Sequence, residues 1–119
     1  MSGEVFWLLE LNVNLGRENE FRSLMAEMVA AAETNEPRTL TYLWNLHADG
    51  TMCHIYERYA DSEAALEHLR NFQEKFTSRF LDVLAPTRFV VYGSPSDELK
   101  EALTGFLPFY MHQVGGFAR

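Results

Sequence analysis

Glu57 is the residue whose surroundings point most directly to chemistry. It stands in a segment whose alternate positions, Cys53, Ile55 and Tyr59, are apolar or aromatic, and on a strand such positions share one face. Loss of water around the carboxyl group would raise its pKa toward the range that suits a general base. The alternative is a structural acid that Tyr42, Tyr59 or a backbone N–H satisfies, or an acid at a wet pocket mouth. Glu57 and Tyr59 are therefore candidate catalytic residues.

His68 is the second candidate for proton transfer. It comes one position before the apolar Leu69 in a predicted helix, which would bring its imidazole to the rim of a pocket, where the neutral ring could accept a phenolic proton. The alternative is a solvated histidine on a mixed helix face. His47 and His54 fall on the opposite face of the predicted sheet, where they suit contacts between subunits. Four scattered histidines and one cysteine have no metal-ligand spacing, so we expect no metal site.

Aromatic and aliphatic side chains could surround these polar groups. Large rings that face one another can form a flat apolar pocket that stacks a planar ligand, and alternatively they are ordinary core. The candidate substrate-binding residues are Trp7, Leu9, Tyr42, Trp44, Ile55, Phe72 and Phe76. The sequence has no glycine-rich phosphate loop, nucleophile elbow or supported Ser/His/Asp arrangement, so we expect no nucleotide or flavin site and no cofactor.

A hairpin around Asp49 and Gly50 assigns many of these side chains to faces. Asp-Gly between two alternating apolar runs predicts a two-residue type I′ turn, which needs a positive φ at both central residues. This turn sets the opposing pairs Ala48–Thr51, Leu46–Cys53, Trp44–Ile55, Tyr42–Glu57 and Leu40–Tyr59. The other face carries a mixture suited to a partner or to water, namely Thr41, Leu43, Asn45, His47, Met52, His54, Tyr56 and Arg58.

Periodicity and helix-ending residues predict the other elements. A central strand over residues 4–14 places one apolar set on a single face: Trp7, Leu9, Leu11 and Val13. A helical stripe from Phe21 to Ala32 ends before Pro37, and a second stripe, from a cap at Asp61 or Ser62 to Phe80, is one bent helix or two. The C-terminal elements are a strand Thr87–Gly93 opened by Pro86, a helix from Ser94 to Leu103 ended by Gly105, and an edge strand Phe106–Gln113 containing Pro108.

The order of the first six elements, β-α-β-β-α-β, predicts the fold. It indicates an α+β, ferredoxin-like domain, in which an antiparallel four-stranded sheet carries both helices on one face. We expect residues 1–119 to form a single domain with a core over 4–93 and a C-terminal extension over 94–119. The uncovered face carries Phe6, Leu8, Leu43 and Tyr56, so we expect a homodimer packed sheet to sheet. The last strand is a candidate for lengthening the partner's sheet.

Composition limits the classes of partner and location. The chain of 119 residues is long enough for one domain with one core. Its net charge of −7, without a cluster of Lys and Arg, argues against nucleic acid or an anionic membrane surface as partner. No apolar run approaches the length of about 18 residues that a membrane span needs. A single cysteine and the lack of a signal segment make cytoplasmic residence the expectation.

Two segments resemble antibiotic-biosynthesis-monooxygenase domains of the dimeric α/β-barrel superfamily. One is the end of the first strand, Asn14-Leu15-Gly16-Arg17, and the other runs from Tyr56 to Leu69 and begins Tyr56-Glu57-Arg58-Tyr59-Ala60-Asp61-Ser62. The resemblance covers about residues 4–93. It implies a dimeric α/β barrel, in which each subunit of a homodimer has one pocket between sheet and helices.

The branches of this family differ in the activity that they imply. Haem-degrading members have an Asn in the first strand and a Trp in the second helix, where this chain has Leu9 and His68, so haem degradation is not expected. Quinol-oxidising members have an Asn and a Trp on the third strand, where this chain has Ile55 and Tyr59. The resemblance implies a cofactor-independent monooxygenase, in which Glu57 or His68 deprotonates a small planar aromatic or quinol-type substrate and the anion reacts with O₂. The alternative is a non-catalytic ligand-binding or stress-related dimer of the same fold.

Overall fold

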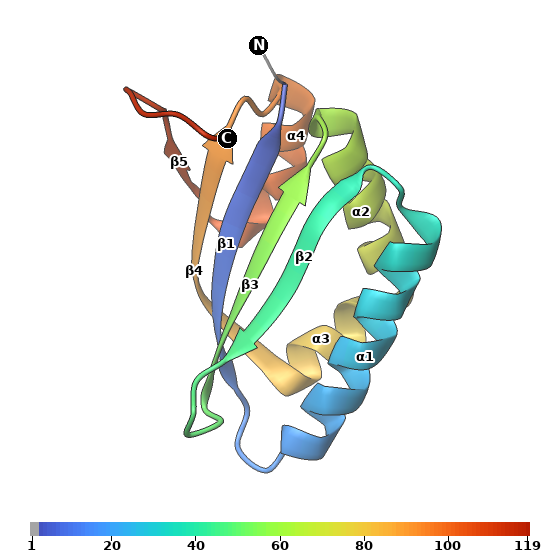
Figure 1. The fold of residues 1–119 in the computed structure, drawn as a ribbon. Helices are drawn as coiled ribbons and strands as arrows, with labels where there is room; N and C mark the ends of the chain where they lie inside the picture. Colours follow the sequence, from blue (N-terminus) through green and yellow to red (C-terminus); the bar gives the residue numbers. More distant parts are fainter. Residues whose placement is uncertain (1–2) are drawn as a thin grey trace.

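The computed structural model describes residues 3–119, which form a five-stranded sheet with helices on one face (Figure 1). The elements in chain order are β1 (Val5–Val13), α1 (Glu18–Asn35), β2 (Thr39–Leu46), β3 (Met52–Tyr59), α2 (Ser62–Lys75), α3 (Thr77–Val83), β4 (Leu84–Gly93), α4 (Asp97–Leu103), the 3₁₀ turn η1 (Thr104–Phe106) and β5 (Phe109–Met111). The strand order is β2-β3-β1-β4-β5, and the first four strands pair antiparallel. This arrangement confirms the predicted ferredoxin-like fold.

Strand β1 is the centre of the fold because it pairs with β3 on one side and with β4 on the other. Its odd-numbered residues from Val5 to Leu11 are buried, whereas the even-numbered residues between them are partly exposed. The predicted alternation is therefore confirmed. Cys53 lies on β3 in the same buried layer, and burial raises the pKa of its thiol to about 12.

The β2–β3 hairpin keeps the predicted register over most of its length. Tyr42 lies opposite Glu57, as the sequence predicts, so that both side chains reach the helix-covered face. The predicted pairing of Leu40 with Tyr59 is wrong. The register shifts near the start of β2, and Thr39 takes the place opposite Tyr59.

The hairpin turn differs from the predicted type I′. Gly50 has a φ of 77°, but Asp49 does not share the positive φ that a type I′ turn requires at both positions. Instead, the Asp49 carboxylate accepts hydrogen bonds from the backbone N–H and from the hydroxyl of Thr51. This side-chain turn, typical of aspartate, holds a longer loop without changing the register beyond it.

The two long helical stripes begin and end close to the predicted residues. Helix α1 ends at Asn35, before Pro37, and the Asp61 carboxylate caps α2 by accepting a hydrogen bond of 2.9 Å from the N–H of Ala64. The second stripe is two helices, because the chain bends at Phe76 between α2 and α3. None of the helices in residues 3–119 is long and apolar enough to cross a membrane.

Strand β4 begins earlier than predicted. It starts at Leu84, so Pro86 lies inside the strand and does not open it. The register between β1 and β4 shifts between Glu10 and Leu11, next to the proline. An irregular position of this kind tolerates a residue that cannot donate a backbone hydrogen bond.

The C-terminal extension also departs from prediction in its details. Ser96, not Ser94, caps α4 by accepting a hydrogen bond from Leu99 N–H, and the residue that ends η1 is Leu107 in the left-handed conformation, not Gly105. Strand β5 is only three residues long, follows Pro108, and pairs in parallel with β4 of the same chain. Its position at the sheet edge is as predicted.

Gly93 lies at the end of β4, opposite Val5 at the start of β1, and its replacement by alanine should destabilise the protein. Its φ is 89°, and an added Cβ would lie 2.3 Å from the carbonyl oxygen of Glu4. We expect Gly93→Ala to lower the free energy of unfolding by about 2 to 4 kcal/mol, because the left-handed backbone and the clash both oppose the side chain. Urea unfolding measures this change. Gly105→Ala is the control, because its Cβ meets open space, and an equal loss there would contradict this explanation.

Candidate active site

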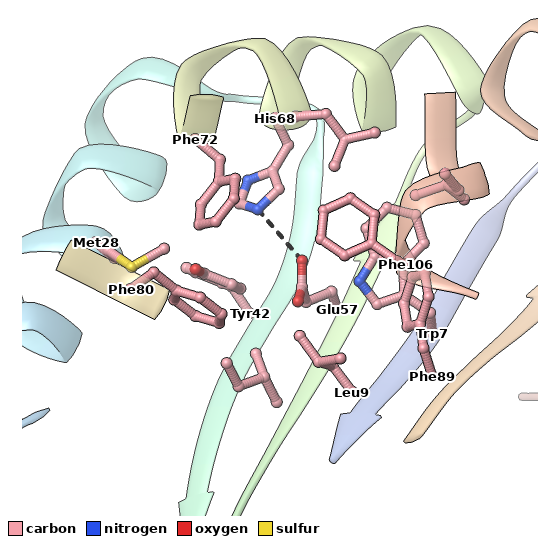
Figure 2. Close-up of a pocket in the computed structure, with 13 residues that line it drawn as sticks. Trp7, Leu9, Met28, Tyr42, Glu57, His68, Phe72, Phe80, Phe89 and Phe106 are labelled. Atoms are coloured by element: carbon pink, nitrogen blue, oxygen red, sulfur yellow. Dashed lines mark ion pairs between the residues drawn. The ribbon is translucent and has the colours of Figure 1, made fainter. Parts of the chain in front are cut away.

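A cavity lies between the helix-covered face of the sheet and the elements α1, α2, α3, α4 and η1 (Figure 2). Its volume is about 40 Å³, enough for a few water molecules. The polar residues of its wall are Tyr42, Glu57 and His68. The rest of the wall is apolar and consists of Trp7, Leu9, Met28, Ile55, Leu69, Phe72, Phe80, Phe89, Leu103 and Phe106.

Glu57 projects from β3 into this cavity and is held by two donors at one oxygen. The Tyr59 hydroxyl donates a hydrogen bond to Oε1. Nε2 of His68 lies 3.2 Å from the same atom (Figure 2). The other oxygen, Oε2, accepts no hydrogen bond from residues 3–119. Because it is also not fully shielded from solvent, a small molecule can reach it. The side chain is almost fully buried, at 4% exposure. Oε2 is therefore a fixed proton acceptor that faces the cavity.

His68 connects Glu57 to a second acid. It lies on the buried face of α2, and its Nδ1 is 2.8 Å from Oε1 of Glu36. Burial alone would lower the pKa of His68, but its interactions with Glu36 and Glu57 outweigh burial and raise the pKa to about 9. The ring is therefore an imidazolium at neutral pH. This corrects the predicted neutral imidazole at a pocket rim, because both nitrogens face carboxylates.

Glu36 is a polar residue beside the cavity that was not predicted from the sequence. It follows α1 and is buried, at 4% exposure, where it also accepts hydrogen bonds from the Thr39 hydroxyl and from Nδ2 of Asn71. Although burial would raise its pKa, hydrogen bonds and the charge of His68 lower it below the ordinary value. The available signal was the polar pair His68 and Asn71, three residues apart on the apolar face of α2. Such a pair needs a partner, but the sequence does not say which.

The two tyrosines near Glu57 have different positions. Tyr42 lines the cavity beside His68, with ring centroids 5.2 Å apart, whereas Tyr59 is fully buried behind Glu57 and does not line the cavity. Burial and the charge of Glu57 raise the pKa of both phenols well above the ordinary value. Both hydroxyls therefore stay protonated. Tyr59, a predicted catalytic residue, therefore lies behind Glu57 and not at the cavity.

Most of the predicted substrate-binding residues do meet at the cavity. Trp7, Leu9, Tyr42, Ile55 and Phe72 line it. Two predicted residues, Trp44 and Phe76, do not, because Trp44 packs against Phe21 and Phe80 farther along the sheet and Phe76 sits at the bend after α2. The wall residues from β4 and the C-terminal extension, Phe89, Leu103 and Phe106, were not predicted, because sequence alone did not show that the extension covers this site.

The arrangement can bind an uncharged apolar molecule and take a proton from it. Two carboxylates and one imidazolium leave one negative charge in excess, which disfavours an anionic ligand in an apolar wall. Within residues 3–119, no group of three His, Cys, Asp or Glu side chains is arranged to hold a metal ion. The chemistry that these residues offer is proton transfer by fixed groups.

Comparison of the whole chain with solved structures identifies proteins of the same fold. MupZ from Pseudomonas fluorescens superimposes with a TM-score of 0.87 and 24% identity, over 100% of this chain and 91% of MupZ. SnoaB, a cofactor-independent oxygenase from Streptomyces nogalater, gives 0.66 and 15% over 80% of this chain and 96% of SnoaB. A protein from Nitrosomonas europaea, provisionally named an antibiotic biosynthesis monooxygenase, gives 0.68 and 18% over 79% and 92%.

These likenesses show the fold. The chain has the fold of the antibiotic-biosynthesis-monooxygenase proteins, as the resemblance in its sequence implied. The superposition with MupZ spans the whole chain, including the C-terminal extension, whereas the other two superpositions leave about a fifth of it uncovered. No family model matches the chain, and no curated protein matches its sequence.

Proposed function

We propose that the protein is a cofactor-independent monooxygenase of a small, uncharged aromatic or quinol-type substrate. The observation that carries this proposal is the array Glu36–His68–Glu57, which holds one oxygen of Glu57 and leaves the other facing an apolar cavity. The fold shared with SnoaB supports the same class of reaction.

In the proposed reaction, Oε2 of Glu57 accepts a proton from an acidic O–H or C–H group of the substrate. The electron-rich anion adds O₂ at a carbon that carries a further hydrogen and takes the proton back to form a hydroperoxide in the water-poor cavity. Loss of that second hydrogen breaks the O–O bond, expels the outer oxygen as water and leaves a carbonyl, so the substrate supplies all four electrons. His68 stays protonated and limits the rise in negative charge near the substrate anion. Glu36 and Tyr59 act as positioning residues, because they contact His68 and Glu57 and not the cavity.

A second candidate is a non-catalytic ligand-binding protein of the same fold. The observation that favours it is the cavity volume of about 40 Å³, since a filled interior suits a binding or structural role better than turnover. In this function Glu57 is a structural acid that Tyr59 and His68 satisfy.

One experiment separates these functions. Planar phenols and quinols are screened for thermal stabilisation of the protein, and each hit is followed with an oxygen electrode and by product analysis. We expect substrate-dependent oxygen uptake without any added cofactor. Stabilisation without conversion would support the binding protein. Conversion of a compound without oxygen uptake would instead indicate a redox-neutral reaction. In that reaction Glu57 would take a proton from the substrate and the His68 imidazolium would donate one.

We also propose that two copies pair through the sheet face that the helices leave uncovered. This face carries Phe6, which stacks on Tyr92 with ring centroids 5.2 Å apart, and Leu43, which is 55% exposed. An apolar face of this kind is typical of an interface. Light scattering should give twice the chain mass of 13.7 kDa. Leu8→Glu, in the middle of this face, should give monomers, whereas Leu81→Glu, on the exposed side of α3, should not change the mass.

A further inference from the structure

The cavity beside Glu57 is smaller than the ring compound that the proposed function requires. Its volume is about 40 Å³. An apolar cavity of about 150 Å³ is the size that binds benzene. A planar aromatic ligand can therefore occupy this site only if part of the wall moves, and the wall residues differ in how firmly they are held.

Most of the aromatic wall is fixed by burial. Trp7, Phe72, Phe80 and Phe89 are all less than 8% exposed and lie on long strands or on helices packed against the sheet. Phe106 is different, because it is partly exposed and belongs to the short 3₁₀ turn between α4 and β5. It is the wall residue with the least support.

The segment that carries Phe106 has few ties to the core. Among residues 3–119, the hydrogen bonds of this turn stay within the extension: Leu107 N–H donates to the Thr104 carbonyl, and the Thr104 hydroxyl donates to the Lys100 carbonyl. Leu107 has a φ of 54°, in the left-handed region that residues other than glycine rarely adopt. The turn can therefore change conformation without breaking a sheet or helix ladder.

Both ends of this segment are anchored. Leu99 and Leu103 of α4 are fully buried, and the N–H of Ser96 donates a hydrogen bond of 2.8 Å to the Ser62 hydroxyl at the start of α2. On the other side, β5 pairs with β4 from Val90 to Tyr92. Displacement of Phe106 therefore requires movement of the turn alone, while the rest of the extension stays in place.

We propose that the Phe106 ring occupies the position of a ligand ring, and that a planar, uncharged aromatic compound binds by displacing it. The ring packs edge to face on Phe89, with centroids 5.9 Å apart, and Phe89 packs in the same way on Trp7 at 5.4 Å (Figure 2). A ligand ring in this position would keep the contact with Phe89 and lie in the cavity that Glu57 faces. This inference rests on the proposed function for the chemistry at Glu57, but it concerns binding alone.

The test is a fluorescence titration with N-phenyl-1-naphthylamine, an uncharged probe made of two planar ring systems. The protein carries Trp44→Phe, so that Trp7 is its sole tryptophan and its quenching reports a ligand in the cavity. We expect Phe106→Ala to lower the Kd about tenfold, since the smaller side chain leaves room for the ligand ring. Phe106→Trp, in which the fluorescence of the probe replaces Trp7 quenching as the readout, should raise the Kd about tenfold, since the larger side chain occupies that room. An anionic analogue, 8-anilino-1-naphthalenesulfonate, should not quench Trp7.

The matched control is Phe109→Ala. Phe109 lies three residues farther along the same extension, is 60% exposed beneath Arg88, and does not line the cavity, so its removal should leave the Kd unchanged. An unchanged Kd in both Phe106 variants, or binding without quenching of Trp7, would overturn the inference. If Phe106 controls binding and no bound phenol or quinol is converted, the proposed function fails and this inference stands. If turnover occurs and the Phe106 variants bind normally, the proposed function stands and this inference fails.

Discussion

Glu57→Gln should lower the turnover of a substrate of this protein by a factor of about 10² to 10⁴, the share that a positioned base usually supplies. Glutamine keeps a carbonyl oxygen that can accept hydrogen bonds from Tyr59 and His68, the two groups that hold Oε1 in the native protein. It cannot take up the substrate proton. Ligand binding should therefore survive while kcat falls, and the measurement is a comparison of kcat with the Kd of the same substrate.

The control for this prediction is Glu74→Gln. Glu74 is exposed on α2 and does not line the cavity, so its amide variant should keep full turnover. Thermal unfolding of both variants shows whether either has lost its fold. If Glu57→Gln stays folded and turns over at the native rate, another group takes the proton.

Removal of His68 should have the largest effect on stability. We expect His68→Gln to lower the free energy of unfolding by about 3 to 5 kcal/mol at neutral pH, because Glu36 and Glu57 would remain buried without the cation between them. Urea unfolding measures this loss. His47→Gln is the matched control, because His47 is exposed in the hairpin loop beside Asp49, and such a site changes stability by no more than about 0.5 kcal/mol. A similar small change at His68 would show that the two acids do not depend on it.

Stability should fall with rising pH in both the native protein and His68→Gln, but in different pH ranges. In the native protein the pKa of His68 is about 9, above its ordinary value, so its contribution is complete below about pH 6.5 and is lost as the pH rises through 9. This contribution is about 2 to 4 kcal/mol. In His68→Gln, Glu36 keeps the burial that raises its pKa and loses the cation that lowers it, so its protonation should let stability rise as the pH falls toward 5. Native stability that stays constant from pH 6.5 to 9 would contradict the assigned charge of His68.

The sequence predicts the fold well, because that part depends on local patterns. Alternation in β1 and the register that sets Tyr42 against Glu57 both follow from a period of two and survive small errors in the turn. The turn itself was predicted wrongly, since the Asp49 side chain offered the backbone different hydrogen bonds. Strand β4 began early because proline is tolerated beside a bulge.

The candidate site was only partly predictable, because its polar array joins distant segments. The inward position of Glu57 follows from hairpin pairing, which is local. The contact between Glu36 and His68 spans 32 positions and depends on how α2 packs beside the end of α1. No periodicity encodes such a contact, and without Glu36 the sequence gives no reason for an imidazolium. Phe106 was missed for the same reason, since the path of the extension is set by packing of α4 on α2.

The central place of β1 has a consequence for the order in which the protein assembles. This strand precedes both of its partners, β3 and β4, in the chain, so Val5 can pair with Gly93 only after β4 has been synthesised. Pairings between such distant segments are slow to form, because a long loop must close before any contact offsets its lost entropy. Trp7 on β1 and Phe89 on β4 pack their rings together, and they form a common wall of the cavity only when these two strands pair. The cavity therefore forms late in folding, and a nascent chain that ends before β4 lacks a complete binding site.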